Sequence, residues 1–110
     1  MPHDSDWMEL SWSPIIRFDK MALGKIPRTK GLYRIVSSDK NRILYIGETK
    51  NLRNRCRSHQ NKDWRDESVG VSYVSYSKYI LDYQLRELEV DLIGCYFFTY
   101  VEAPLFQYGG

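Results

Sequence analysis

Cysteine is scarce in this chain, and the two cysteines, Cys56 and Cys95, lie far apart in the sequence. They form no CxxC pair and no histidine–cysteine cluster with the spacing of a zinc site. A disulfide-rich scaffold is therefore excluded. We expect two reduced thiols rather than a disulfide between them.

Long apolar runs are also missing, and none reaches the length that a membrane span needs. The N-terminal stretch MPHDSDWMEL is acidic and polar, unlike a secretory signal. We find no internal repeat and no low-complexity tract. With 110 residues, 43% of them hydrophobic and 27% charged, the chain is expected to form one globular domain in the cytoplasm.

An excess of one charge sign is absent as well, because the formal net charge is only +2. The local distribution is more informative, since residues 50–57 contain four cations and no acid: Lys50, Arg53, Arg55 and Arg57. Such a basic patch suits a partner that carries phosphate groups. From charge alone, a solvated helix face is the alternative.

Residues that favour strands gather in three segments of the chain. They predict strands at residues 31–37, 43–48 and 69–76. The turn cluster SSDKNR separates the first two, which predicts an antiparallel hairpin.

Three helices are expected around these strands. Ser13 as N-cap and Pro14 as the first helical residue predict a short helix that extends to about Leu23, after an irregular lead-in over residues 1–13. The polar residues Thr49 and Asn51 are candidates to cap a second helix, which would reach about Gln60.

The third and longest helix is predicted from about residue 78 to 93. Ser77 is the candidate N-cap, and Gly94 is expected to end the helix before an aromatic tail. The resulting order is helix, strand, strand, helix, strand, helix, tail. This order indicates an α/β fold in which helices cover a small sheet.

Two polar residues stand out on the second predicted helix. On a helical wheel, His59 shares a narrow stripe with Leu52 and Cys56, and Arg55 lies at the edge of that stripe. This is the side expected to pack on the sheet, where an unpaired charge is costly.

A carboxylate occupies a similar position on the third helix, where Glu89 borders a stripe of leucines. One interpretation is an internal ion pair between Arg55 and Glu89, with His59 hydrogen-bonded nearby. The other is that the three line a cleft together with Tyr33 and Tyr45 from the hairpin, if the strand register places both tyrosines on one face.

Such a cleft would contain the groups that phosphodiester cleavage requires. An arginine meets phosphate oxygens with its planar fork. One carboxylate can hold a single Mg²⁺ that keeps most of its water. A tyrosine with a lowered pKa can accept a proton from water, and a histidine can relay it. Because there is no second acidic cluster, a two-metal site is not expected.

At this point the residues resemble the GIY-YIG nuclease family. The resemblance is carried by GLY at 31–33, YIG at 45–47, Arg55, His59 and Glu89, and it covers about Pro27 to Pro104. It divides the chain into an N-terminal extension with a short helix, residues 1–26, and a GIY-YIG-like domain, residues 27–110.

The resemblance implies a three-stranded antiparallel sheet flanked by helices, and an endonuclease that hydrolyses DNA phosphodiesters with one Mg²⁺ or Mn²⁺. By position, Tyr33 would be the general base and Tyr45 would orient the water or the phosphate. Arg55 would bind the scissile phosphate, and His59 would hydrogen-bond within the site. Glu89 would be the metal ligand.

The chain departs from the family at two positions. Many relatives have a lysine where this chain has Glu48, and an asparagine where it has Gln107, so Gln107 becomes the candidate site amide. The cations Lys50, Arg53 and Arg57 are candidates for binding DNA phosphates.

Two other functions stay open at this point. One is a module of the same fold that binds nucleic acid without cutting it. The other is an interaction domain whose partner surface is built from Trp7, Trp12 and the aromatic tail. For a nuclease, the expected partners are DNA and a protein that supplies target recognition. The family includes DNA repair, restriction, recombination and mobile-element enzymes, and the sequence selects none of them.

Overall fold

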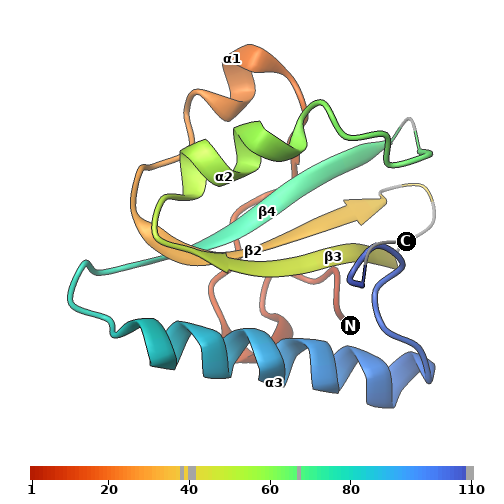
Figure 1. The fold of residues 1–110 in the computed structure, drawn as a ribbon. Helices are drawn as coiled ribbons and strands as arrows, with labels where there is room; N and C mark the ends of the chain where they lie inside the picture. Colours follow the sequence, from red (N-terminus) through yellow and green to blue (C-terminus); the bar gives the residue numbers. More distant parts are fainter. Residues whose placement is uncertain (38, 40–41, 67, 109–110) are drawn as a thin grey trace.

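The computed structural model describes residues 1–37, 39, 42–66 and 68–108. Its centre is a four-stranded antiparallel sheet between two helical layers (Figure 1). The helices α1 (Lys20–Leu23) and α2 (Leu52–His59) cover one face of the sheet. The long helix α3 (Asp82–Tyr100) covers the other face.

The three strands expected from the sequence are confirmed as β2 (Lys30–Ser37), β3 (Arg42–Thr49) and β4 (Val69–Tyr76). Strand β2 lies between the other two, so β3 forms one edge of the sheet. The register places Tyr33 opposite Gly47 on β3 and opposite Tyr73 on β4.

The expectation of a three-stranded sheet is wrong by one strand. A short strand, β1 (Ile16–Arg17), pairs with β4 through Val71 and Gly70 and forms the other edge. Two residues are too few to show a period of two, so this strand exists only because the neighbouring strand is available for pairing.

The helix that follows β1 begins later than predicted. Its N-cap is Asp19, whose carboxylate accepts hydrogen bonds from the backbone N–H groups of Met21 and Ala22. The predicted cap, Ser13, is used elsewhere, because its hydroxyl oxygen accepts a hydrogen bond from the N–H of Tyr73. The helix predicted from Pro14 is thus wrong in its start.

The third helix begins and ends later than predicted, at Asp82 and Tyr100. The cap is Leu81 rather than Ser77, and the side chain of Gln84 accepts a hydrogen bond from the Leu81 N–H. Gly94 does not end the helix, which continues through the aromatic residues of the expected tail. The end comes at Val101, in the left-handed region.

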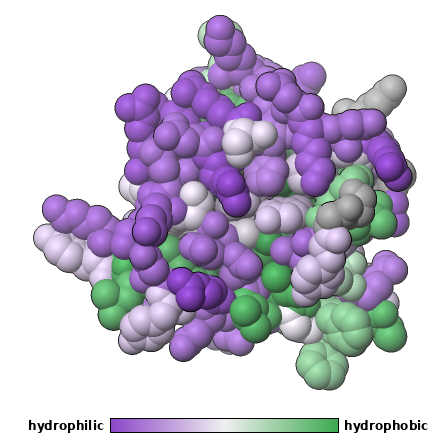
Figure 2. Space-filling model, in the orientation of Figure 1, coloured by the Kyte–Doolittle hydropathy of each residue, from purple (hydrophilic) through white to green (hydrophobic). Residues whose placement is uncertain are grey.

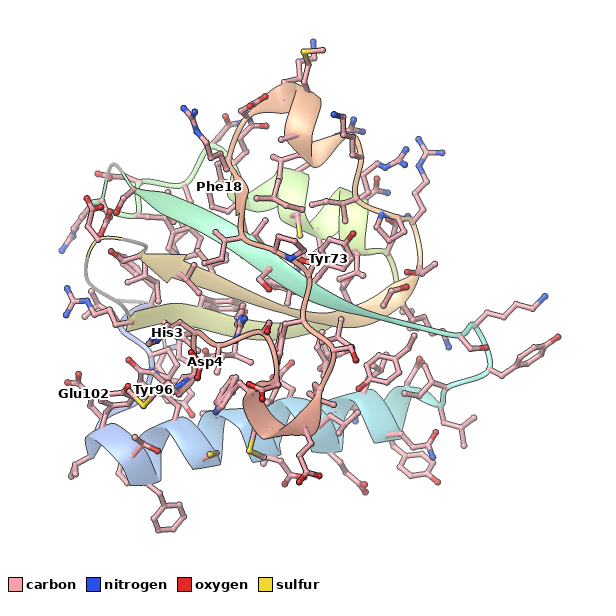
Figure 3. All side chains as sticks on the ribbon, turned by 180° about the vertical axis from the view of Figure 1, so that it is seen from behind. His3, Asp4, Phe18, Tyr73, Tyr96 and Glu102 are labelled. Carbon is pink, nitrogen blue, oxygen red and sulfur yellow. The ribbon has the colours of Figure 1, made fainter. Side chains whose placement is uncertain are left out.

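The N-terminal segment packs on the α3 side of the sheet and includes a short 3₁₀ turn, η1 (Trp7–Glu9). Trp7 and Trp12 are buried there, so the proposed partner surface built on them is wrong. The buried guanidinium of Arg34, on β2, lies 4.3 Å from the centre of the Trp12 ring. It also donates hydrogen bonds to the carbonyl oxygens of Pro2 and His3. Figure 3 shows this segment from behind.

The sheet separates two apolar cores. One lies against α3 and the N-terminal segment, and the other lies between the sheet and the pair α1 and α2. The thiols of Cys56 and Cys95 are free, as expected. Among the described residues, no helix is both long and apolar enough to cross a membrane.

Candidate active site

Four of the five residues predicted for the site meet where α2 lies over β2 and β3. The hydroxyl oxygen of Tyr33 lies 2.9 Å from Nε2 of His59. The Nε–H group of Arg55 donates a hydrogen bond to the same oxygen at 3.3 Å. The ring of Tyr45 stacks on that of Tyr33, with 6.0 Å between their centres, and lies 5.2 Å from the ring of His59.

The position of α2 explains why Arg55 and His59 reach this point. The side chain of Asn51 accepts a hydrogen bond from the Asn54 N–H and caps the helix, as one of the two predicted candidates. Leu52 and Cys56 are buried against the sheet. Residues one turn beyond this packed face therefore project over the tyrosine ring.

Trp64 also borders the cluster, although no sequence pattern predicts it. Its ring lies 5.5 Å from that of His59 and packs edge-on against Phe106. Its indole N–H donates to the carbonyl oxygen of His59 at 3.0 Å. Trp64 thus holds the end of α2 in place and closes the apolar side of the cluster. It follows a polar loop, so no hydrophobic period marks it.

Gly47 leaves the space that the Tyr33 hydroxyl occupies. A Cβ atom at Gly47 would lie 2.4 Å from that oxygen. At Gly31 a Cβ would meet the carbonyl oxygen of Val74 at 2.3 Å. Both glycines thus permit a close approach that a Cβ would block.

Glu89 reaches the outer edge of β3 from α3. Its Oε2 accepts a hydrogen bond from the backbone N–H of Glu48 at 2.8 Å. Glu48 directly follows Gly47, which lies against the Tyr33 hydroxyl. The Glu89 carboxylate is therefore anchored to β3 one residue beyond this contact. Its side chain is half-buried.

Gln107 also binds the edge of β3. Its side-chain amide accepts from the N–H of Ile46 and donates to the carbonyl oxygen of the same residue, both at 2.8 Å. This two-point contact pairs strand groups that would otherwise be exposed at an edge. The contact gives the candidate site amide a structural task, which is to hold the strand that carries Tyr45.

The protonation states in the cluster follow from its burial. Burial, reinforced by the nearby Tyr45, raises the pKa of Tyr33 well above its usual range, although Arg55 acts in the opposite direction. The hydrogen bond to Tyr33 in turn raises the pKa of Arg55. Burial, together with the positive charges of Arg55 and Lys62, lowers the pKa of His59 to about 4. At neutral pH, Tyr33 is thus protonated and His59 is neutral.

The carboxylate of Glu89 is in a different electrostatic environment. Burial raises its pKa, and so does the negative charge of Glu48, while the hydrogen bond from the Glu48 backbone and the charge of Arg55 lower it. A cation beside two carboxylates would offset their repulsion. The donor set thus fits a hard divalent ion that keeps most of its water. Within the described residues there is no cluster of three or more histidine, cysteine or acidic side chains that could hold a metal.

The interpretation of Arg55 and Glu89 as a direct ion pair is not confirmed. In the described part of the chain, no ion pair within 4.0 Å joins them. The carboxylate acts on Arg55 only at longer range. The arginine is exposed on its outer side, so its charge is accessible to an anion from solvent.

The three cations proposed to bind DNA phosphates differ from one another. Lys50 is exposed and forms an ion pair with Asp82 at 3.2 Å. Arg53 is half-buried, and its Nε–H donates to the carbonyl oxygen of Ile26 at 2.7 Å, so it also has a structural task. Arg57 is exposed.

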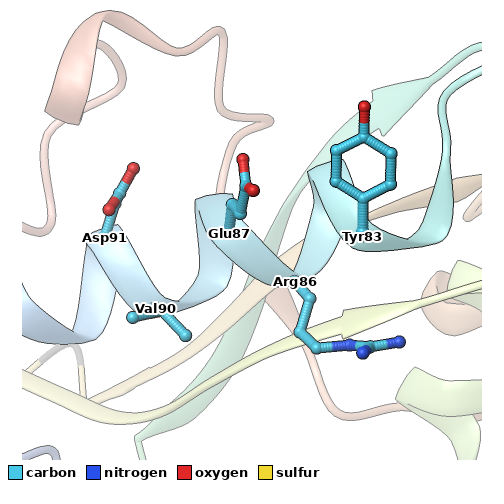
Figure 4. A pocket seen from close by; sticks show the side chains of 5 residues that line it. All are labelled: Tyr83, Arg86, Glu87, Val90 and Asp91. Carbon is cyan, nitrogen blue, oxygen red and sulfur yellow. The ribbon is translucent and has the colours of Figure 1, made fainter.

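A hollow of about 370 Å³ lies elsewhere, on the outer face of α3 (Figure 4). It is lined by Tyr83, Arg86, Glu87, Val90 and Asp91. All five come from one helix, and none belongs to the cluster around Tyr33. This depression is therefore separate from the candidate site.

The arrangement has counterparts among known proteins. The model of the GIY-YIG catalytic domain matches residues 29–99. The UvrABC system protein C of Borrelia duttonii (strain Ly) is 35% identical over 83 residues, as is that of Borrelia recurrentis (strain A1). The matched part is 69% of this chain but only 13% of each relative.

One solved structure has the same fold. It is the GIY-YIG N-terminal endonuclease domain of UvrC from Thermotoga maritima, a point mutant bound to its catalytic divalent cation. The TM-score is 0.55 at 23% identity, and the match covers 70% of this chain and 87% of that one. At this identity the likeness concerns the fold.

Proposed function

The chain belongs to the GIY-YIG catalytic domain family, and from that premise we propose that it is a metal-dependent DNA endonuclease. The observation that carries the proposal is the contact of the Tyr33 hydroxyl with both His59 and Arg55. This places a proton acceptor and a fixed cation on one oxygen, while the half-buried carboxylate of Glu89 is held on the β3 backbone at Glu48. Hydrolysis of a phosphodiester requires these groups.

In this mechanism Arg55 binds the scissile phosphate. Its Nε–H is held by the Tyr33 oxygen, which fixes the guanidinium plane and leaves its outer N–H groups for the phosphate oxygens. Because the group is held before the reaction, it stabilises the charge that develops in the transition state without reorganising.

Tyr33 and His59 move the proton from water. Arginine can only donate, so the tyrosine oxygen accepts from it and directs its own proton to Nε2 of His59. Since burial keeps Tyr33 protonated, it acts as a base only by passing this proton to the neutral imidazole while it takes one from water. Tyr45 stacks on the ring and holds it, or the water, in position.

Glu89 would hold the divalent ion, with Glu48 nearby adding negative charge. Its Oε2 is fixed by the Glu48 N–H, and Oε1 accepts no hydrogen bond from the described residues. A divalent ion supplies Lewis-acid stabilisation of phosphate oxygens and of the leaving group. Mg²⁺ and Mn²⁺ both suit a site with one carboxylate and many water ligands.

The biological setting follows from the relatives only as a proposal. Those relatives are named for the UvrABC system, and this chain spans 13% of their length. We propose a role in DNA repair in which a protein partner supplies target recognition. The cytoplasmic location stays a prediction.

Cleavage assays over a metal titration test the proposed activity. Plain, nicked and branched DNA are incubated with increasing Mg²⁺ or Mn²⁺, with EDTA as the control. The proposal predicts metal-dependent strand breaks on at least one substrate. Tight binding without any cleavage would favour the non-cutting module instead.

A further inference from the structure

We propose that residues 17–28, which precede the region of the family match, form a second phosphate-binding surface that holds the backbone of double-stranded DNA. The proposal rests on the proposed DNA endonuclease function. It adds a binding surface from a part of the chain that the family model does not include, since the match begins at residue 29.

The segment presents cations that the protein itself does not neutralise. Four basic side chains are exposed and make no hydrogen bond or ion pair with any described residue: Arg17, Lys20, Lys25 and Arg28. The one acid of the segment, Asp19, turns its carboxylate to the backbone N–H groups at the start of α1. Unpaired surface cations of this kind exchange their counterions readily for phosphate groups.

Hydrogen bonds fix the segment against the start of α2. The backbone N–H groups of Leu52 and Arg53 donate to the carbonyl oxygens of Thr29 and Pro27 at 2.9 and 3.2 Å. The Nε–H of Arg53 donates to the carbonyl oxygen of Ile26 at 2.7 Å. The C-terminal end of the segment is therefore held beside the start of α2, which places its cations next to those of α2.

The surface continues that of α2 toward the reactive cluster. An Nη atom of Arg57 lies 3.3 Å from the point where a Cβ at Gly24 would be, so this arginine spans the junction of α1 and α2. On the other side of α2, Arg55 reaches Tyr33. Cations thus extend from α1, across α2, to the proposed scissile phosphate.

The outer face of α3, on the other side of the sheet, has more exposed acids than cations in its first half. Its exposed acids are Glu87 and Asp91, beside the cation Arg86. Two further acids of α3 are engaged elsewhere, because Asp82 pairs with Lys30 and Lys50 and Glu89 is held at the candidate site. Figure 2 shows mostly hydrophilic side chains over α1 and α2, and hydrophilic and apolar ones intermixed around α3. The low net charge of +2 conceals this separation, which orients a polyanion onto the α1–α2 side. Because the cations are spread over two elements, they suit an extended backbone rather than one small anion.

The test is the salt dependence of DNA binding, measured without metal so that cleavage plays no part. Fluorescence anisotropy with a labelled plain duplex in EDTA, over a KCl series, gives the slope of log K against log salt. For Lys20→Gln/Lys25→Gln/Arg28→Gln, we expect the slope to become shallower by about 2–3, since each phosphate contact contributes about 0.9. The affinity should fall at least tenfold at low salt.

Two controls make the result specific. The charge-retaining variant Lys20→Arg/Lys25→Arg/Arg28→Lys should keep the wild-type slope, and so should Lys78→Gln, which removes an exposed cation before α3. A triple glutamine variant with the wild-type slope would overturn the proposal, as would equal losses in the charge-retaining variant. Stronger binding to a duplex RNA than to DNA would also overturn it. A wild type that binds DNA in this way but never cuts would refute the endonuclease function alone.

Discussion

The hydroxyl oxygen of Tyr33 and Nε2 of His59 lie 2.9 Å apart across the interface of β2 and α2. The two residues are 26 positions apart in the sequence. Gly47 leaves the space that the Tyr33 hydroxyl occupies. Trp64 holds the end of α2, where His59 lies, by a hydrogen bond to the His59 carbonyl oxygen.

Replacement of Tyr33 by phenylalanine should remove the proton transfer and keep the packing. The ring still stacks on Tyr45, so the loss of stability should be about 0.5–1.5 kcal/mol. Single-turnover cleavage should fall about 10²–10⁴-fold. Tyr73→Phe is the matched control, because Tyr73 faces Tyr33 on β4. Equal activity of the two variants would exclude Tyr33 from the proton transfer.

Gly47→Ala should damage the site through Tyr33. The added Cβ would lie 2.4 Å from the tyrosine oxygen, so the hydroxyl must move away from His59 and Arg55. We expect destabilisation of about 1–3 kcal/mol by overpacking, together with a loss of cleavage. In contrast, Gly94→Ala meets no atom within 4 Å and should stabilise α3 by about 0.5–1 kcal/mol. Urea unfolding of both variants tests this, and a neutral Gly47→Ala would contradict the geometry.

His59 should make the protein less stable in mild acid. Burial lowers its pKa from the usual value of 6.5 to about 4 in the folded state. Between these values the unfolded chain binds more protons, so the free energy of unfolding decreases as the pH falls from about 6.5 to 4. The difference between wild type and His59→Gln, measured by urea unfolding at several pH values, isolates the histidine. A difference independent of pH would mean that His59 is not held neutral.

Gln107 should stabilise the edge of β3 by its two hydrogen bonds to Ile46. Gln107→Ala leaves both backbone groups without this partner and should reduce the free energy of unfolding by about 1–3 kcal/mol. Gln107→Glu keeps the acceptor for the N–H but loses the donor to the carbonyl, so an intermediate loss is expected. If thermal unfolding shows both variants at wild-type stability, the contact is not a clamp.

The sequence predicted the parts of the fold that have their own pattern. The strands around Tyr33, Tyr45 and Val71 alternate or form apolar runs, and Asn51 is a recognisable cap. The site residues on α2 could be found because polar side chains, Arg55 and His59, occur on or beside the apolar side of the helix.

Other parts depend on tertiary contacts that no local pattern shows. Strand β1 exists through pairing with β4, and Ser13 lost its expected capping role to a bond with Tyr73. Helix α3 continues past Gly94 because the buried Leu92 and Tyr96 on either side pack in the core, which outweighs the low helix propensity of glycine. The buried pair of Arg34 and Trp12 joins segments that have no sequence relationship.

We infer that the cluster around Tyr33 cleaves phosphodiesters with a divalent metal. Its most direct test is the single-turnover rate of DNA cleavage in Mg²⁺ by wild type, Arg55→Ala and Glu89→Ala, each shown to be folded by circular dichroism. We expect each variant to lose about 10²–10³-fold or more in rate, because each lacks a charge fixed in the site. Cleavage by both variants at the wild-type rate would contradict it.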